Sequence, residues 1–404
     1  MRLPLRTAVF WAHLVCGVAI ATVVLVMSVT GVILTYEQQM VQWADREYWT
    51  TPAAPGERAP LSALATSAEA YDPESRASSL ILYSDPDAPV MATIGGGRNL
   101  YLDPSTAQVR GENNTGMRGF LAHVRGWHRW FNVSGEGRGL ARAVTGWANL
   151  AFLFLILSGL YLWFPRRWAE QHLRTAFLIR AGTKGRARDF NWHQVFGFWS
   201  AIPLAVIVFT AVTISFPWAR NWTLSFVPAD PPTPSVSSPA PLVDDAPGAE
   251  PRPFEAAILD AVVPRLEARV DDWRRITLTI PGATGTPIRA RIEQGLPGQP
   301  QKKVSVTYDA SSGREVAFST FADQDATSRA RDFLRFAHTG EYFGVIGQTI
   351  AGVVTLLSLI LVWTGLSLAL RRMLRAVRRG NGSDANEPVE ESASDEAERA
   401  ATAV

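Results

Sequence analysis

The sequence predicts an α-helical membrane protein with four transmembrane helices and two small α+β extramembrane lobes, built by internal duplication. Four apolar runs are each long enough to cross a hydrocarbon layer of about 30 Å, which takes about 20 helical residues. Two longer, more polar stretches contain segments in which apolar and polar residues alternate, as in half-buried strands. The same short motifs recur in both halves of the chain, in the same order.

The composition agrees with this class. Hydrophobic residues make up 47% of the 404 and include 14 tryptophans, while the mean hydropathy is only +0.03. The chain is therefore too apolar in blocks, and too polar between them, for one soluble domain. Nothing in it is typical of nucleic-acid binding, and we expect no nucleic-acid partner. The single cysteine, Cys16, excludes a disulfide framework and a cysteine-based metal cluster.

We place the transmembrane helices at residues 8–36, 143–165 and 191–217. The fourth lies within residues 331–370, where a histidine-bearing segment precedes an apolar run that begins at about residue 344. The first run lacks a small-residue cleavage site, so we expect a retained helix and not a signal peptide.

Basic residues beside the helices predict the orientation. Arg6 precedes the first helix, a basic loop at 166–190 joins the second helix to the third, and arginines follow the fourth. Because positively charged loops stay in the cytoplasm, we expect both termini there and residues 37–142 and 218–343 outside. In a Gram-negative bacterium the outer compartment is the periplasm, so we expect a multi-pass protein of the inner membrane, with the lipid bilayer as one partner.

Each outer stretch is expected to form a small lobe of one helix followed by three strands. The first lobe occupies residues 37–116, with its helix at 61–71 and its strands at 79–83, 89–94 and 99–102. The second lobe occupies residues 254–330, with its helix at 254–268 and its strands at 275–280, 287–292 and 303–308. A Pro- and Ser-rich linker at 218–253 precedes the second lobe, and the acidic tail at 380–404 is expected to be disordered.

Matching motifs mark the duplication within the helices. His13 and His193 each begin a His-x-x-x-Gly motif, and Thr30 and Thr210 follow them at the same offset. In the second helix of each half, Ser158-Gly159-Leu160 aligns with Thr364-Gly365-Leu366. Small residues let helix backbones approach closely, and we expect these glycines and hydroxyl residues to serve helix packing.

Several segments carry a resemblance to a known family. Trp127-His128-Arg129 lies in an interfacial segment at 117–142, and Ala337-His338 precedes the fourth helix. Further motifs are the Tyr-Leu-Asp-Pro-Ser-Thr and Tyr-Asp-Ala-Ser-Ser-Gly turns of the lobes and the Ser-Gly-Leu-Tyr-Leu-Trp end of the second helix. With these motifs and its helix-lobe-helix layout, nearly the whole chain resembles PepSY-associated transmembrane-helix proteins. Within that family it is most similar to the inner-membrane ferric-siderophore reductases, whose members bind haem b between helices.

Four histidines at the ends of apolar runs are the candidate iron ligands. A titratable side chain near bilayer depth is costly unless a partner offsets its desolvation, and haem iron accepts two axial imidazoles from facing helices. Pairing by depth predicts two haem b groups, one held by His13 and His193 and one by His128 and His338. Pairing within each half is the alternative, but the predicted depths then disagree. His123 is a rival to His128.

Arg129 and Trp127 are further candidate cofactor contacts. The guanidinium group of Arg129 can pair with haem propionates, and the indole of Trp127 can pack against a porphyrin. The guanidinium groups of four other arginines can pair with propionates in the same way: Arg125, Arg138, Arg142 and Arg335. Ordinary interfacial contacts explain such residues equally well. No nucleophile, acid-base dyad or hydrolytic triad is evident, so the catalytic residues are unknown.

The resemblance and the histidine pattern together predict an oxidoreductase that reduces ferric siderophores in the periplasm. Its electrons would come from a donor in the cytoplasm or the membrane. Reduction weakens the chelate, because Fe(II) is softer and less charged than the Fe(III) that hard oxygen ligands prefer. The alternatives are a haem-free PepSY-type binding or sensor protein and a small metal transporter; no Walker-type glycine loop supports ATP-driven transport.

Overall fold

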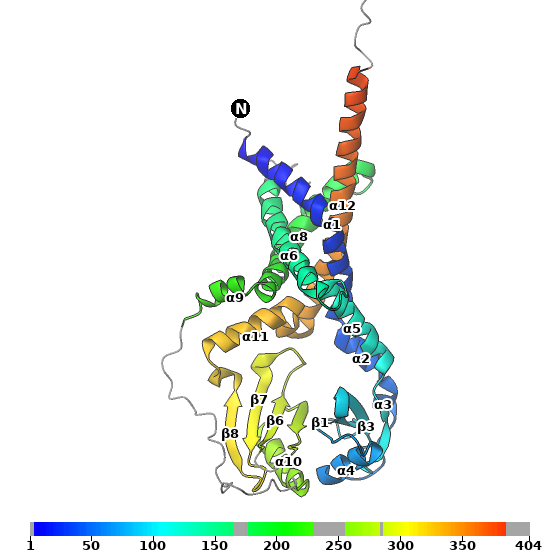
Figure 1. The fold of residues 1–404 in the computed structure, drawn as a ribbon, viewed down its shortest axis with the longest axis vertical. Coiled ribbons are helices and arrows are strands. Elements are labelled where there is room, and N and C mark those ends of the chain that lie inside the picture. The colour runs from blue at the N-terminus through cyan, green and yellow to red at the C-terminus, as the bar shows by residue number, and fades with distance from the viewer. Residues whose placement is uncertain (1–3, 165–173, 175–176, 229–254, 283–285, 385–404) are drawn as a thin grey trace, which may run out of the picture. The chain divides into compact units, whose positions relative to one another are not determined.

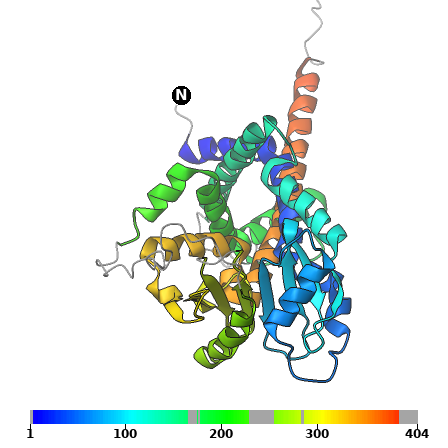
Figure 2. The ribbon, with the colours of Figure 1, turned by 60° about the horizontal axis from the view of Figure 1, so that its bottom comes forward.

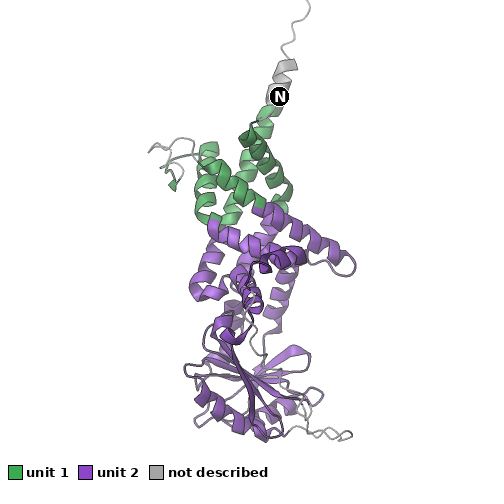
Figure 3. Ribbon diagram, turned by 90° about the vertical axis from the view of Figure 1, so that its left-hand side faces the viewer, with its two compact units in different colours: residues 1–22, 154–201, 357–404 green, residues 23–153, 202–356 purple. Residues whose placement is uncertain are grey.

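The computed structural model describes residues 4–164, 174, 177–228, 255–282 and 286–384, with side chains as far as residue 376. The chain divides into two compact units, which Figure 3 distinguishes by colour. Unit 1 comprises Met1–Thr22, Phe154–Ala201 and Leu357–Val404, and unit 2 comprises Val23–Leu153 and Ile202–Leu356. Most of the predicted linker and of the tail, and much of the predicted basic loop, lie outside the described residues.

Four long helices confirm the predicted class of membrane protein. They are α1 (Leu5–Thr35), α6 (Gly137–Trp163), α8 (Gly185–Ser215) and α12 (Gly344–Asp384) (Figure 1). All four are long and apolar enough to cross a membrane, and the fourth candidate span runs over Glu341–Ala376. Each of these helices contributes residues to both units.

The helices extend beyond the apolar runs that predicted them. Helices α6 and α8 each begin six residues before the predicted start, at Gly137 and Gly185, and α12 continues to Asp384 instead of ending near residue 370. An apolar run marks the part of a helix that suits hydrocarbon, whereas the backbone hydrogen bonds continue through polar flanks. The prediction that the chain is disordered from residue 380 is therefore wrong for residues 380–384.

Glycines allow close helix pairs within unit 1, as expected for the His-x-x-x-Gly motif. A Cβ atom added at Gly17 would lie 3.9 Å from Leu155, and one added at Gly197 would lie 3.7 Å from Leu361. The two glycines therefore stand at equivalent contacts, α1 with α6 and α8 with α12. This repetition is the structural counterpart of the duplicated sequence.

Two short amphipathic helices of unit 2 carry the remaining candidate histidines near their C-terminal ends. They are α5 (Thr115–Trp130) and α11 (Ala326–Thr339). The side chains of Asn114 and Asp325 cap their N-termini, and Gly340, whose φ of 76° favours glycine, caps the C-terminus of α11. Three further helices, α2 (Glu37–Ala44), α3 (Arg46–Thr50) and α9 (Pro217–Leu224), were not predicted.

The strands of both predicted lobes form a single eight-stranded antiparallel sheet, in the order β4-β3-β2-β1-β5-β6-β7-β8 (Figures 1 and 2). The first four strands are β1 (Ser79–Tyr83), β2 (Val90–Ile94), β3 (Arg98–Leu102) and β4 (Val109–Glu112). The other four are β5 (Arg275–Thr279), β6 (Ile288–Glu293), β7 (Lys303–Tyr308) and β8 (Glu315–Thr320). The halves join where β1 pairs with β5, with Ile81 opposite Thr277.

The core of the lobes lies between this sheet and the helices α4 (Leu61–Tyr71) and α10 (Ala257–Arg269). Leu64 from α4, Leu266 from α10 and the strand residues Leu80 and Leu278 are all 0% exposed. Along β1 and most of β6, buried residues alternate with more exposed ones, as the period of two predicts. Burying one leucine side chain contributes about 1.5–3 kcal/mol.

A buried carboxylate ties α5 to the lobe. Asp45, which is 1% exposed, accepts hydrogen bonds from the Tyr101 hydroxyl and the Asn114 backbone N–H, both at 2.8 Å, and pairs with Arg118 at 2.8 Å. Burial by itself would raise the pKa of Asp45, but the bonds from Arg118, Asn114 and Tyr101 outweigh it and lower the pKa. The N-terminal end of α5 is thereby fixed.

Candidate functional site

The first histidine pair lies within unit 1. The ring centres of His13 on α1 and His193 on α8 are 6.5 Å apart, and the ring planes are nearly perpendicular, at 88°. Both residues lie near the N-terminal ends of their helices. The His-x-x-x-Gly motif therefore occupies the same place in each half. The sequence predicts this pairing from depth alone.

Hydroxyl groups orient both rings of this pair. The Nδ1 atom of His13 is 2.8 Å from Oγ of Ser158, and Nδ1 of His193 is 2.9 Å from Oγ1 of Thr364. Each hydroxyl donates its own hydrogen to a carbonyl oxygen one turn earlier in its helix, at 2.7 Å. It is therefore the acceptor toward the imidazole, which assigns the proton to Nδ1 and the lone pair to Nε2.

The second pair lies within unit 2 and repeats the arrangement. The ring centres of His128 on α5 and His338 on α11 are also 6.5 Å apart, with the planes tilted by 53°. His128 Nδ1 lies 3.0 Å from the Thr30 hydroxyl and 3.0 Å from the Met27 carbonyl oxygen. His338 Nδ1 makes the corresponding contacts, 3.3 Å to the Thr210 hydroxyl and 2.9 Å to the Ile207 carbonyl oxygen.

Carbonyl oxygens only accept hydrogen bonds, so Nδ1 carries the proton in this pair as well. Burial, with smaller contributions from His338 and Arg129, lowers the pKa of His128 to about 4, and burial also lowers the pKa of His338. Both rings are therefore neutral at pH 7. Within the described part of the chain no residue bonds Nε2 of any of the four rings, and a neutral imidazole with Nδ1 held and Nε2 open is the form that ligates metals.

Small residues leave room beside the rings. A Cβ atom added at Gly159 would lie 3.4 Å from Cε1 of His13, and one at Gly365 would lie 3.4 Å from Cε1 of His193. In the other pair, a Cβ at Gly31 would lie 3.4 Å from Cε1 of His128. Each glycine directly follows one of the hydroxyl residues that bond the rings.

These hydroxyl residues are functional candidates that the sequence analysis assigned to helix packing. The signal was present, because each position repeats between the halves: Ser158 with Thr364, and Thr30 with Thr210. A hydroxyl followed by a small residue occurs at all four places, with Ala211 standing where the others have glycine. Packing alone would not require a hydroxyl at every one of them.

The spacing within each pair suits two imidazoles that share one metal atom. No group of three or more His, Cys, Asp or Glu side chains suited to a metal occurs among the described residues, whereas a porphyrin needs only two axial ligands. Two imidazoles that bound one shared iron through Nε2, at metal–nitrogen distances of about 2 Å, would have their ring centres roughly 6 Å apart. The observed separation is 6.5 Å in both pairs.

The other predicted residues lie near the second pair without entering it. His123 is exposed, and its Nδ1 is 2.8 Å from the Gly119 carbonyl oxygen of its own helix, so His128 and not His123 faces His338. Trp127 is 47% exposed. Arg129 is exposed as well and places its guanidinium carbon 5.0 Å from the ring centre of Trp130.

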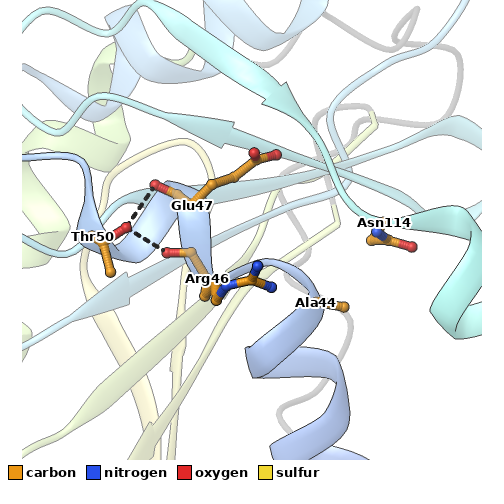
Figure 4. A pocket seen from close by; sticks show the side chains of 5 residues that line it. All are labelled: Ala44, Arg46, Glu47, Thr50 and Asn114. Carbon is orange, nitrogen blue, oxygen red and sulfur yellow. Dashed lines mark hydrogen bonds between the residues drawn. The ribbon is translucent and has the colours of Figure 1, made fainter.

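An open pocket of about 410 Å³ lies elsewhere in unit 2 (Figure 4). Its lining comes from the ends of α2 and α3 and from the cap of α5: Ala44, Arg46, Glu47, Thr50 and Asn114. Thr50 Oγ1 donates to the carbonyl oxygen of Arg46 at 3.1 Å, a bond internal to α3. No histidine lines this pocket, so it does not contribute to either pair.

Comparison with known families adds to this geometry. The sequence matches the PepSY-associated TM region over residues 10–372, which is most of the chain. The chain belongs to this family. Together with the four apolar helices, membership makes it a multi-pass membrane protein. No curated protein matches the sequence of this PepSY-associated protein.

Proposed function

We propose that the protein binds two haem b groups, one at each histidine pair, and passes electrons to ferric siderophores. The donor is a reductant in the cytoplasm or the membrane, and the acceptor is a ferric chelate in the periplasm of a bacterial cell. The observation that carries the proposal is the equal separation of 6.5 Å in two pairs whose Nδ1 atoms are all held by hydrogen bonds.

The residues of the chain perform three tasks in this proposal. The imidazoles would hold the haem iron through Nε2. The hydroxyls and carbonyls keep the proton on Nδ1, a contact that would also tune ligand basicity. The glycines keep the space beside the rings clear. When bound, haem iron changes between its ferric and ferrous states and so carries one electron at a time.

Basic residues beside the first pair support the proposed orientation. Arg6 donates to the carbonyl oxygen of Leu162 at 2.5 Å, and the guanidinium carbon of Arg372 lies 4.7 Å from the ring centre of Trp11. Arginines at these helix ends favour the cytoplasmic side for the His13–His193 pair. The sheet, α5 and α11 then belong to the periplasmic side, with the His128–His338 pair.

The electron balance is simple. Each donor electron converts one chelated Fe(III) to Fe(II), with no bond made or broken at carbon and no proton required. The chelate then releases iron more readily, because hard oxygen ligands hold the less charged Fe(II) more weakly. A haem-free binding protein would lack this reaction, and a transporter would move metal without an electron donor.

Single-turnover reduction tests the proposal. Purified protein is reduced without oxygen, freed of excess reductant and mixed with a ferric siderophore and an Fe(II)-specific chromogenic chelator. We expect haem reoxidation and Fe(II) formation in equal amounts. Haem that stays reduced in the presence of ferric siderophore would contradict the proposed acceptor, and protein isolated without haem from haem-supplied cells would contradict the proposed function as a whole.

A further inference from the structure

Five arginines gather beside the His128–His338 pair, and we call them the arginine cluster. They come from three helices: Arg125 and Arg129 from α5, Arg138 and Arg142 from α6, and Arg335 from α11. All five belong to unit 2. Arg129 directly follows His128, and Arg335 stands one turn before His338, so the cluster touches both helices that carry the pair.

Packing holds parts of the cluster together. The guanidinium carbons of Arg129 and Arg138 lie 5.0 and 4.0 Å from the ring centre of Trp130, so a single indole supports two arginines. The hydroxyl of Thr145 lies 3.0 Å from the carbonyl oxygens of both Arg129 and Arg142, which joins the end of α5 to the start of α6.

Carboxylates compensate only part of the positive charge of the cluster. Arg125 pairs with Glu37, and Arg335 interacts with the carboxylate of Glu341. Arg129, Arg138 and Arg142 form no ion pair with any carboxylate among the described residues. The other four arginines all lie within electrostatic range of Arg129. Like charges held this close destabilise one another unless an anion joins them.

We propose that the arginine cluster binds the acceptor and selects ferric chelates that carry several carboxylate groups. This inference rests on the proposed function. Three exposed arginines without carboxylate partners among the described residues, Arg129, Arg138 and Arg142, suit an anion with several charges, because guanidinium groups form paired hydrogen bonds with carboxylates. A concentrated positive field also raises the rate at which anionic chelates arrive. Haem propionates and lipid phosphates also present anionic oxygens that could bind the arginine cluster, so the experiment must distinguish them from the ferric chelate.

Direct binding of a redox-inert probe tests this inference. Ga(III)–citrate is the anionic probe and a neutral Ga(III) trihydroxamate is the comparison, both titrated calorimetrically into the full chain in a neutral detergent. The variants are Arg129→Gln/Arg142→Gln and Arg335→Gln. Arg331→Gln is the matched control, because Arg331 is also exposed on α11 but interacts with Asp325 and not with the cluster.

We expect the wild type to bind Ga(III)–citrate more tightly than the neutral probe. The Arg335→Gln variant should bind it about tenfold more weakly, as for loss of one charge-assisted hydrogen bond, and the double variant more weakly still. The control variant should bind like the wild type. Equal affinity for the two probes, or unchanged affinity in the cluster variants, would overturn the inference.

Haem content and midpoint potentials are measured on the same samples. Variants that lose one haem or shift its potential while retaining wild-type affinity for Ga(III)–citrate would assign the cluster to haem propionates, which also overturns the inference. Loss of probe binding in nanodiscs that contain phosphatidylglycerol, but not in those of phosphatidylcholine, would assign it to lipid phosphates. A colourless wild type refutes the proposed function, whereas a red protein that does not discriminate between the probes refutes only the selection of anionic chelates.

Discussion

The hydroxyl of Thr30 lies 3.0 Å from Nδ1 of His128, a residue 98 positions later in the chain. Thr210 and His338 repeat this contact at 3.3 Å in the second half. The helix α1 that supplies Thr30 to one pair also carries a histidine of the other pair, and α8 does the same with Thr210. Each first helix of a half thus contributes a ring to one pair and a supporting hydroxyl to the other.

Replacing His193 by alanine should remove one haem and spare the other. The structure places His193 opposite His13 in unit 1, whereas His128 and His338 share unit 2 and have their own supporting bonds. Haem per chain should therefore fall from about two to about one, as measured by a haemochrome assay. His123→Ala is the control, because His123 is exposed and outside both pairs. A His193→Ala protein lacking the same spectral component as His338→Ala would refute the pairing.

Removing the hydroxyl of Thr364 should weaken the haem site without emptying it. Thr364→Val keeps the side-chain shape but loses the acceptor for His193 Nδ1. Supporting contacts of this kind are worth about 10–100-fold in metal affinity, so we expect faster haem loss to an apo-haem acceptor protein and a shifted midpoint potential. Thr364→Ser, which keeps the hydroxyl, should restore both quantities. Wild-type potential and haem loss in Thr364→Val would show that the hydrogen bond has no role in the site.

A larger side chain at Gly365 should displace the His193 ring. Even a Cβ atom at this position would lie 3.4 Å from Cε1 of His193, and the branched side chain of Gly365→Val extends further. We expect a loss of haem comparable to that of His193→Ala. Gly139→Val on α6 is the control, because nothing lies within 4 Å of a Cβ added there. Full haem loading of Gly365→Val would show that this glycine does not shape the site.

Truncating Leu64 should destabilise the lobes without altering the haem spectra. Leu64 is fully buried between α4 and the sheet, and Leu→Ala changes in such positions cost about 2–5 kcal/mol. Thermal unfolding followed by the circular dichroism of the sheet should show a lower midpoint for Leu64→Ala. Thr66→Ala, at an exposed position of the same helix, should unfold like the wild type. An unchanged midpoint for Leu64→Ala would contradict the placement of the core.

The ion pair of Asp45 with Arg118 should make stability depend on pH. The pKa of Asp45 in the folded protein lies below its unfolded value of about 3.9. Its charged form therefore stabilises the fold above about pH 4, and this contribution is lost as the pH falls through the folded pKa. The unfolding midpoint of Asp45→Asn should lie below that of the wild type at neutral pH, and the gap should narrow on acidification. A gap independent of pH would exclude this role for the carboxylate.

The regular parts of the fold could be predicted from local pattern. The helix at 61–71 and the strands at 79–83 and 303–308 match α4, β1 and β7 at both ends, because clear periodicity and turn residues mark them. The edge strands β4 and β8 were missed. Val109-Arg-Gly-Glu112 has little apolar alternation, and β8 buries none of its residues fully, as is common at sheet edges.

The site was predictable in its histidines and not in its hydrogen bonds. Repeated positions and apolar surroundings single out His13 and His193, because both features are visible in the sequence. The contact of Thr30 with His128 depends on how α5 packs against α1, and the pairing of β1 with β5 depends on how two distant strands meet. Such long-range contacts leave no local periodicity in the chain.

The absorption spectrum of the purified protein, before and after dithionite, tests the central claim most directly. Full-length protein is produced in cells supplied with haem, and its haem content is determined per chain. The account predicts a red protein with a reducible low-spin spectrum and about two haems per chain. A colourless protein, or one whose spectrum does not change when both His13 and His128 are replaced by alanine, would contradict it.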